Sequence, residues 1–318
     1  MMPNNPFLSI VVIFCDKDYQ FIESLCKEIN KNVKLSHEII LIDNREVYKD
    51  KFINLPENAF MHSVGYNAYQ FEGRRLAVQF CSGKYVWYVD ADDEVLIVED
   101  YWKDAISDED VALFSAMMTD LSFKLNKSFF IRKALLNNSI YLSRDWHELE
   151  LKNVWNFFGC CLWDKWIKRT VLEEVIKLIP KNKVIVASED KFYISLVMKN
   201  SCKIFITNHL IYNYKIKNST CAKNIMSYES FCHIIRGYKE VEKLFNKYIN
   251  DPLWQDKGFD FNFFLSKIPN TDRPKESLKE IVNNFGLNYV KDNFSNFLKS
   301  VPEDSRKVFD KILDEVLQ

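Results

Sequence analysis

Three short apolar runs in the first 90 residues place the strongest constraint on the fold of this 318-residue chain. They span residues 7–15, 37–44 and 85–90, and each leads into acidic or polar residues. Runs that are apolar almost throughout, rather than alternating, are typical of parallel strands buried on both faces. The intervening segments 19–30 and 71–83 carry apolar residues at helical spacing. This order predicts right-handed βαβ units, and therefore an α/β fold with a mostly parallel central sheet and helices on both faces.

The predicted strands end on polar residues that could meet a ligand: Cys15 with Asp16, Asp43, and Asp90 with Asp92. In open α/β sheets, ligands bind outside the carboxyl ends of the strands. We therefore interpret the N-terminal part of the chain as a nucleotide-binding half. The sequence has no G-x-G-x-x-G or Walker A loop, so we expect phosphates to be held in another way.

The third strand runs directly into four carboxylates, in the stretch GKYVWYVDADDEVL: Asp90, Asp92, Asp93 and Glu94. Such a cluster of like charges costs free energy, and it is typical of a place where a cation binds. Mg²⁺ and Mn²⁺ prefer carboxylate oxygens and bridge to substrate phosphates. The alternative is a solvated turn in which Asp93 or Glu94 begins a helix. The position at the end of a strand favours the metal site, with Asp93 the weaker candidate.

Composition and charge exclude several classes of protein. The formal net charge is −1, so no global field attracts nucleic acid or an anionic membrane surface. The 8 Cys residues form no C-x-x-C pair and no zinc spacing, which favours buried free thiols in a reducing compartment. The N-terminus lacks a basic region, and its apolar run is too short to cross a bilayer. We expect a cytoplasmic protein, with peripheral contact at the inner face of the cell membrane left open.

The sequence pattern changes after residue 222 from one of strands and helices to one of helices. Beyond it we expect amphipathic helices, and one helix face carries Phe231, Ile234, Ile235, Tyr238, Val241 and Leu244. We therefore expect an α/β domain at 1–222, with a nucleotide-binding half at 1–100 and an acceptor-binding half at 101–222. A packed helical region at 223–318 would follow. That region could mediate a homodimer, cover the acceptor cleft or hold the protein at a membrane.

Six segments stand in an order that resembles a known family. They are LSIVVIFCDKDYQFIESLCKEI, HEIILIDN, GRRLAVQFCSGKYVWYVDADDEV, CLWDKWIKRTVLEE, SEDKFYISLVMK and HLIYNYKIKNSTCA. The family is that of the family 2 glycosyltransferases with the GT-A fold. In order, the six segments resemble its opening strand and helix, its second strand, its A-R-N-x-G…D-A-D-D signature, its W-x-K-x-Y-R segment, its E-D motif and its Y-x-Y-R segment. The resemblance covers the predicted α/β domain and not the C-terminal region.

The chain departs from the family's pattern at three positions. Cys15, which with Asp16 would lie beside the donor nucleotide, stands in place of a Tyr. Asn44 and Arg75 stand where Asp and Asn are usual. The segments that match the metal motif and the base-binding Asp keep their acidic residues, so we expect an active enzyme.

The resemblance implies a role for each matching residue on the donor side. Asp92, the last Asp of D-x-D, would bind Mn²⁺ or Mg²⁺, and Asp90 would reach the ribose or the metal. Asp43 would accept a hydrogen bond from a uracil N–H; a strand-end turn is the alternative. Arg74 would contact the donor phosphates or orient the acids, and a surface position or a structural pair with the acidic cluster is the alternative.

On the acceptor side, the resemblance implies that Asp190 is the general base, with Glu189 the next candidate. Inversion at the sugar carbon needs a carboxylate on the far side from the leaving diphosphate, where it takes the proton of the acceptor hydroxyl. The alternative is a helix N-terminus with Ser188 as its cap and the acids favouring the helix dipole.

Together these features predict a metal-dependent inverting glycosyltransferase. The donor would be a nucleotide-diphosphate sugar, with UDP favoured. The acceptor would be a hydroxyl of a glycan or lipid-linked glycan in bacterial cell-surface polysaccharide, lipooligosaccharide or glycoprotein assembly. Trp163, Lys165 and Trp166 could floor the acceptor site; a place in the core is the alternative for either Trp. Two other functions stay open: a catalytically inactive glycosyltransferase-like binding module, and a sugar nucleotidyltransferase, which the lack of Gly and Arg in residues 10–20 disfavours.

Overall fold

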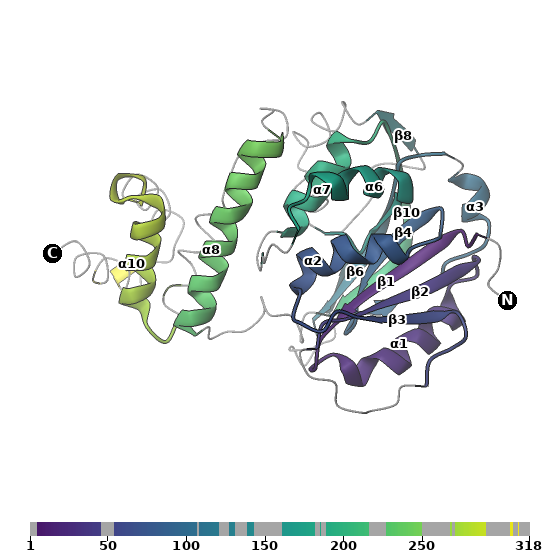
Figure 1. The fold of residues 1–318 in the computed structure, drawn as a ribbon, viewed down its shortest axis with the longest axis horizontal. Helices are drawn as coiled ribbons and strands as arrows, with labels where there is room; N and C mark the ends of the chain where they lie inside the picture. The colour runs from purple at the N-terminus through teal and green to yellow at the C-terminus, as the bar shows by residue number, and fades with distance from the viewer. Residues whose placement is uncertain are drawn as a thin grey trace. The chain divides into compact units, whose positions relative to one another are not determined.

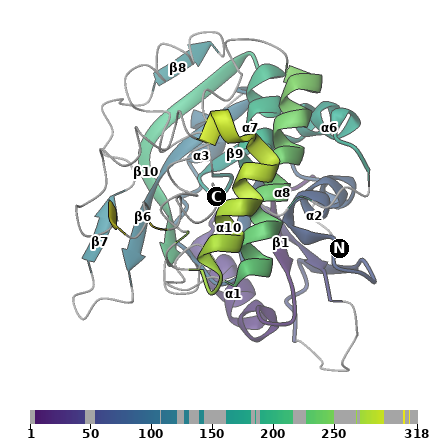
Figure 2. The ribbon, with the colours of Figure 1, turned by 90° about the vertical axis from the view of Figure 1, so that its left-hand side faces the viewer.

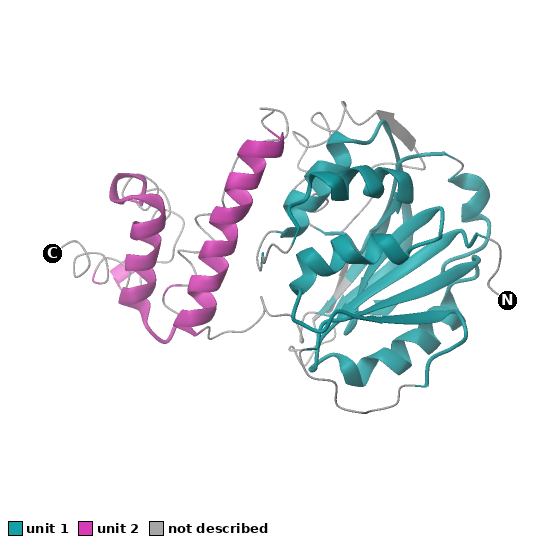
Figure 3. Ribbon diagram, in the orientation of Figure 1, with its two compact units in different colours: residues 1–185, 189–219 teal, residues 186–188, 220–318 magenta. Residues whose placement is uncertain are grey.

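The computed structural model describes residues 5–45, 54–106, 108–120, 127–130, 139–142, 161–181, 185, 189–215, 227–249, 268, 271–290, 306–307 and 311. The chain divides into two compact units, each described here by itself: residues 1–185 with 189–219, and residues 186–188 with 220–318 (Figure 3). The predicted boundary after residue 222 lies outside the described residues and stays a prediction.

Unit 1 is built on a ten-stranded mixed sheet (Figure 1). Eight strands lie in the order β3 (Ala59–Ser63), β2 (His37–Asp43), β1 (Leu8–Phe14), β4 (Tyr85–Asp90), β9 (Lys165–Lys168), β6 (Val111–Asp120), β10 (Lys203–Lys215) and β5 (Glu94–Val95). The other two are β7 (Lys127–Phe130), which pairs with β6, and β8 (Ser139–Leu142), which pairs with β10. The first four strands of the row are mutually parallel, and β9 runs antiparallel between β4 and β6. The three apolar runs are therefore neighbouring parallel strands, as predicted.

One face of the sheet is covered by α1 (Tyr19–Asn32), which lies in the segment predicted as the first helix. Its buried side chains are Ile22, Leu25, Cys26 and Ile29. They share one core cluster with Leu8, Ile10, Val12 and Phe14, which are alternate residues of β1 and so point to the same face.

The opposite face is covered by α2 (Tyr69–Ala77), α6 (Arg169–Leu178) and α7 (Glu189–Lys199), with α7 packed against both other helices (Figure 1). Close approach of α2 to the sheet depends on Gly73. A Cβ at this position would come within 3.0 Å of the Ile13 side chain of β1.

The second predicted helix is shorter than the sequence pattern indicated. α2 ends at Ala77 and continues as a 3-10 turn over Val78–Phe80, so the helical segment ends before Gly83, the last residue of the predicted segment. Gly83 instead lies against β1, where a Cβ would come within 2.5 Å of the Ser9 backbone nitrogen. The glycine is therefore required by close packing rather than by helix termination.

Residues 203–215 alternate as a pair of strands would, but they form a single long strand, β10. Its pairing with β6 shifts register between Ile206 and Tyr212, which marks an irregularity within the strand.

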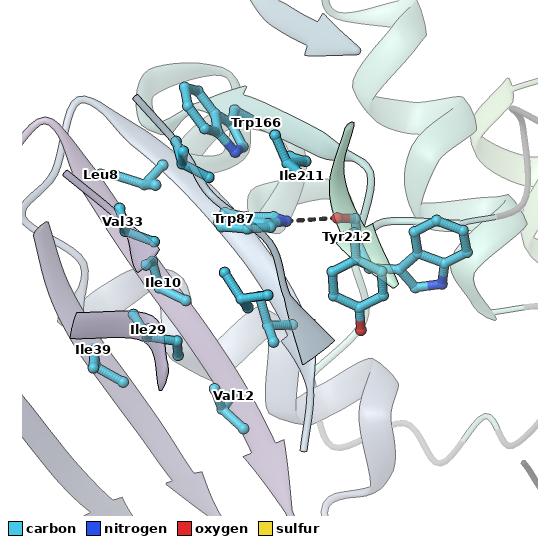
Figure 4. Packing of buried hydrophobic residues seen from close by; sticks show 14 of the residues in the cluster. Leu8, Ile10, Val12, Ile29, Val33, Ile39, Trp87, Trp166, Ile211 and Tyr212 are labelled. Atoms are coloured by element: carbon cyan, nitrogen blue, oxygen red, sulfur yellow. Dashed lines mark hydrogen bonds between the residues drawn. The ribbon is translucent and has the colours of Figure 1, made fainter. Parts of the chain in front are cut away.

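The core of unit 1 is rich in aromatic side chains near the centre of the sheet (Figure 4). Trp87 donates from its indole N–H to the Trp163 carbonyl at 2.5 Å, which satisfies a polar group that the core would otherwise leave unpaired (Figure 4). Trp166 packs on Phe114 with ring centroids 4.3 Å apart. In the described part of the chain, Cys15, Cys26, Cys81, Cys202 and Cys232 are free thiols.

Unit 2 is the predicted C-terminal helical region. It contains α8 (Tyr228–Leu244), followed by the π-helical turn Phe245–Ile249, and α10 (Pro274–Phe285), which packs against α8 (Figures 1 and 2). Of the predicted apolar face of α8, four members are buried: Phe231, Ile235, Val241 and Leu244. An ion pair between Arg236 and Glu280, 3.5 Å apart, joins the two helices. None of the helices in the described part of the chain is both long and apolar enough to cross a membrane.

Candidate active site

The carboxyl ends of β1, β2 and β4 lie side by side at one edge of the sheet. Phe14, at the end of β1, is paired with Asp43, at the end of β2. Ile13 is paired with Asp90, at the end of β4. Parallel pairing therefore brings together the strand ends that the sequence singled out as candidate ligand-binding positions.

Two of the four clustered carboxylates are tied to β10. Asp93 is buried and accepts hydrogen bonds from the Tyr212 hydroxyl at 2.6 Å and the Lys215 backbone N–H at 2.8 Å. Glu94 accepts a hydrogen bond from the Asn213 side-chain amide at 2.7 Å. Glu94 begins the short strand β5, so the alternative in which Asp93 or Glu94 begins a helix is wrong.

Asp90 and Asp92 are the two carboxylates of the cluster that β10 does not hold. Burial raises the pKa of Asp90, Arg74 opposes that rise, and Asp190 and Asp92 add to it, so that it reaches about 6. Burial, followed by the charge of Asp18, also raises the pKa of Asp92. A cation placed beside these two side chains would favour their charged forms.

This donor set fits a divalent cation that protein and nucleotide hold jointly. Mg²⁺ and Mn²⁺ prefer carboxylate oxygens, and Mg²⁺ typically keeps several waters and binds through one or two carboxylates plus substrate phosphates. Asp90 and Asp92 supply two carboxylates at the end of β4. Across the described residues, no group of three or more His, Cys, Asp or Glu side chains is arranged to hold a metal. The protein would therefore need the ligand's phosphates to complete the coordination.

The chain after β1 brings two further carboxylates to this edge, Asp16 and Asp18. Asp16 is exposed, and the preceding Cys15 is half-buried. The backbone N–H and the thiol of Cys15 donate to the Asp18 carboxylate at 3.2 and 3.1 Å. Burial, together with Asp18, raises the pKa of the Cys15 thiol, which is therefore protonated at neutral pH.

Arg74 of α2 reaches the first turn of α7. Its guanidinium forms an ion pair with Asp190 and lies 3.7 Å from the Glu189 carboxylate. Burial and the charge of Asp190 raise the pKa of Glu189 to about 8 against the opposing effect of Arg74. The side chain of Asp190 is 25% exposed and that of Glu189 is 16% exposed, so Asp190 is the more accessible of the two. Ser188, the predicted helix cap, lies outside the described residues.

Two tyrosines pack beneath the Arg74 backbone. The hydroxyls of Tyr88 and Tyr193 lie 3.0 Å apart, and Tyr88 also donates to the Arg74 carbonyl at 3.4 Å. The Arg74 side chain is buried, and its Nε is without a hydrogen-bond partner in the part of the chain that is described. Arg74 therefore presents an unused donor beside the carboxylates of Asp90, Glu189 and Asp190, a donor that an anionic group could accept from.

Asp43, the predicted base-binding residue, is fully buried beneath Arg45. The Arg45 guanidinium donates to both carboxylate oxygens of Asp43, at 2.8 and 2.7 Å, in a bidentate pair. The Cζ atom of Arg45 lies 4.1 Å from the centroid of the Tyr19 ring, so the guanidinium is held between a carboxylate and an aromatic face. Asn44 donates to the Tyr69 carbonyl at 3.1 Å and thereby ties β2 to the start of α2.

The predicted acceptor residues all lie in or against the core. Trp166 and Lys165 have no exposed surface, and Lys165 pairs with Asp164 at 2.6 Å. Trp163 is 7% exposed and stacks on Tyr212 and Tyr214, with centroids 5.0 and 5.7 Å away. These positions agree with the core alternative for each Trp, and the acceptor role stays a prediction.

Sequence reasoning missed three residues of this edge: Asp18, Arg45 and Tyr212. Arg45 stands two positions after Asp43, so its proximity carried a local signal. Asp18 lies close in sequence to Cys15, but nothing marked its carboxylate as facing the acidic turn. Tyr212 meets the turn from 119 positions away, a contact that one sequence does not reveal.

The chain has the mixed α/β sheet with helices and the C-terminal helical region that were predicted, and it shares this fold with solved structures of S. aureus TarS. A TarS 1–349 structure in complex with UDP-GlcNAc matches with a TM-score of 0.54 and 15% identity, over 93% of this chain and 82% of that one. A complex of TarS 1–349 with UDP matches with a TM-score of 0.52 and 14% identity, over 97% and 87%.

A longer TarS structure matches with a TM-score of 0.52 and 14% identity over 93% of this chain, which spans 49% of that protein's length. No protein-family model matches the sequence, and no curated protein does. The likeness therefore establishes the fold alone.

Proposed function

We propose that this chain is a metal-dependent inverting glycosyltransferase that moves a sugar from a UDP-sugar to a hydroxyl group of a glycan. One observation carries the proposal: the Asp190 and Glu189 carboxylates at the start of α7 share the guanidinium of Arg74, whose charge also acts on Asp90 at the end of β4. The fold is shared with TarS, whose structures include complexes with UDP and UDP-GlcNAc.

The two acidic groups suit the two ends of a displacement at the sugar carbon. Asp190 would accept the proton of the acceptor hydroxyl while the oxygen of that hydroxyl forms a bond to the sugar carbon. The bond between that carbon and the diphosphate oxygen breaks in the same event, so the leaving group departs as UDP. Asp190 is favoured over Glu189 because its side chain is more exposed.

The donor diphosphate would lie between Arg74 and the acidic turn. Asp90 and Asp92 would hold Mn²⁺ or Mg²⁺, an ion that, when bound, neutralises charge on the departing diphosphate. The buried Nε of Arg74, which has no partner among the described residues, would be a donor for a phosphate oxygen. Asp43, Cys15 and Asp16 would lie along the nucleoside, with Arg45 between Asp43 and the ligand.

The sequence resemblance extends the proposal to the acceptor. We infer a glycan or lipid-linked glycan of bacterial cell-surface polysaccharide, lipooligosaccharide or glycoprotein assembly, in a cytoplasmic protein at the inner face of the membrane. Unit 2, in which α10 packs against α8, would provide either the homodimer contact or the membrane contact.

The test is calorimetric titration of the full chain with UDP, with and without Mn²⁺, followed by donor hydrolysis with UDP-, GDP- and dTDP-sugars. We expect UDP to bind in a metal-dependent way and a UDP-sugar to be hydrolysed. Asp100→Asn is a matched control for later variants, because Asp100 is exposed and pairs only locally with Lys103 among the described residues.

Each failure points to a different conclusion. Metal-dependent UDP binding without hydrolysis or transfer of any sugar would favour the binding module. Absence of nucleotide binding under every metal condition would contradict the proposed function altogether.

A further inference from the structure

One buried hydroxyl of strand β10 contacts two residues of the acidic turn. Tyr212 of β10 is fully buried, and its hydroxyl donates to the Asp93 carboxylate at 2.6 Å. The same oxygen accepts a hydrogen bond from the Asp90 backbone N–H at 3.1 Å. The Tyr212 hydroxyl oxygen therefore contacts both Asp90, which ends β4, and Asp93 of the acidic turn.

Neighbouring residues of β10 fasten the rest of the turn. The Lys215 backbone N–H donates to Asp93 at 2.8 Å, and the Asn213 side chain donates to Glu94 at 2.7 Å. β10 also pairs with β5 in antiparallel register, with Tyr212 opposite Val95. The turn is thus clamped on one side by a strand that is far from it in sequence.

The ring of Tyr212 is itself fixed. It stacks on Trp163 at 5.0 Å, with the planes inclined by 9°, and meets Trp87 edge-on at 6.4 Å. Trp87 also donates a hydrogen bond to the Trp163 carbonyl, so the rings of Tyr212, Trp163 and Trp87 form one packed group. A hydroxyl carried by a ring without rotational freedom places its two partners accurately.

We propose that Tyr212 is a positioning residue for cation binding: its hydroxyl engages Asp93 as an anchor, so that Asp90 and Asp92 alone face a divalent cation. The inference rests on the proposed function. Without the hydroxyl, the Asp93 carboxylate would lose a partner and the Asp90 amide an acceptor, and the turn would be free to take other arrangements. Groups behind metal ligands typically change metal affinity about ten- to a hundredfold when they are removed.

The test compares Tyr212→Phe with Tyr85→Phe. Tyr85 is an equally buried tyrosine of the sheet, and its hydroxyl donates to the Glu109 carbonyl at 2.8 Å, at the other end of β4. Both changes remove one buried hydroxyl with its donated hydrogen bond, and Tyr212→Phe also removes the acceptor of the Asp90 N–H, so Tm should fall in both variants and further in Tyr212→Phe. The affinity for Mn²⁺, titrated with and without UDP, separates a positioning role from a structural one.

We expect Tyr212→Phe to weaken Mn²⁺ binding roughly tenfold or more, while Tyr85→Phe leaves it within about twofold of the parent. Hydrogen–deuterium exchange of peptides covering residues 88–95 should also become faster in Tyr212→Phe alone. Equal Mn²⁺ affinity in the two variants would overturn the inference. If the parent binds no Mn²⁺, the proposed function fails, and the exchange of the turn then decides whether Tyr212 holds it: unchanged exchange overturns that claim as well.

Discussion

Arg74 and Asp190 stand 116 positions apart in the sequence and form an ion pair between α2 and α7. Glu189 lies beside the same guanidinium at 3.7 Å, so one cation serves two carboxylates. The pair links the predicted donor side of the site to the predicted general base. It also makes the stability of unit 1 depend on residues that belong to the site.

Replacing Arg74 by Met should lower the free energy of unfolding by about 3 kcal/mol, because it leaves partly buried carboxylates without their cation. Asp190→Asn should cost less, and the double variant should lose clearly less than the sum of the two, since the residues interact directly. Urea unfolding of the four proteins measures this coupling. Strictly additive costs would mean that the ion pair does not form in solution.

Glu189 should make the protein less stable as the pH rises. Its pKa is about 8 in the folded chain, above the ordinary value of 4.5, so between these values the folded state keeps a proton that the unfolded state has lost. Stability therefore falls with rising pH across this window. Tm measured from pH 5 to pH 8 should fall less steeply in Glu189→Gln.

A matched control for the pH series is Glu174→Gln on α6, where the carboxylate is 62% exposed and pairs with Lys177 on the surface. This variant should follow the parent profile. If the Tm of Glu189→Gln changes with pH as the Tm of the parent does, the Glu189 carboxyl titrates normally and the raised pKa is wrong.

Gly83→Ala should destabilise the chain by about 2 to 3 kcal/mol, because the new methyl group meets the backbone of Leu8 and Ser9 and the strand cannot retreat. Gly65→Ala is the comparison: no atom lies within 4 Å there, but φ is +77°, so only conformational strain of about 1 kcal/mol is expected. Thermal and urea unfolding measure both. A Gly83→Ala protein as stable as the parent would contradict the packing of this loop on β1.

The parts of the fold that could be predicted depend on local sequence pattern. The apolar runs that became β1, β2 and β4 needed no knowledge of their partners, because continuous hydrophobicity already requires burial on both faces. The continuity of β10 was not predictable in this way, because its pairing with β6 carries the strand through Thr207, Asn208 and His209 with a shift in register.

The site was predictable in its residue types and not in its contacts. The strand ends placed Asp43, Asp90 and Asp92 at one edge of the sheet because parallel topology dictates it. The partners of these residues come from elsewhere: Arg45 covers Asp43, and Tyr212 engages Asp93. Such contacts depend on side-chain packing between distant segments, which the pattern of one sequence does not contain.

The central claim is tested most directly by UDP affinity with and without Mn²⁺, measured together with turnover, in the parent, Asp92→Asn and Asp190→Asn. Asp92→Asn should lose both UDP affinity and its dependence on Mn²⁺, because it removes the charge that would hold the cation. Asp190→Asn should bind UDP as the parent does and lose about 10²- to 10⁴-fold in kcat, as expected for a general base. If Asp92→Asn binds UDP and Mn²⁺ as tightly as the parent and Asp190→Asn turns over normally, the two acidic groups are not an active site and the account is wrong.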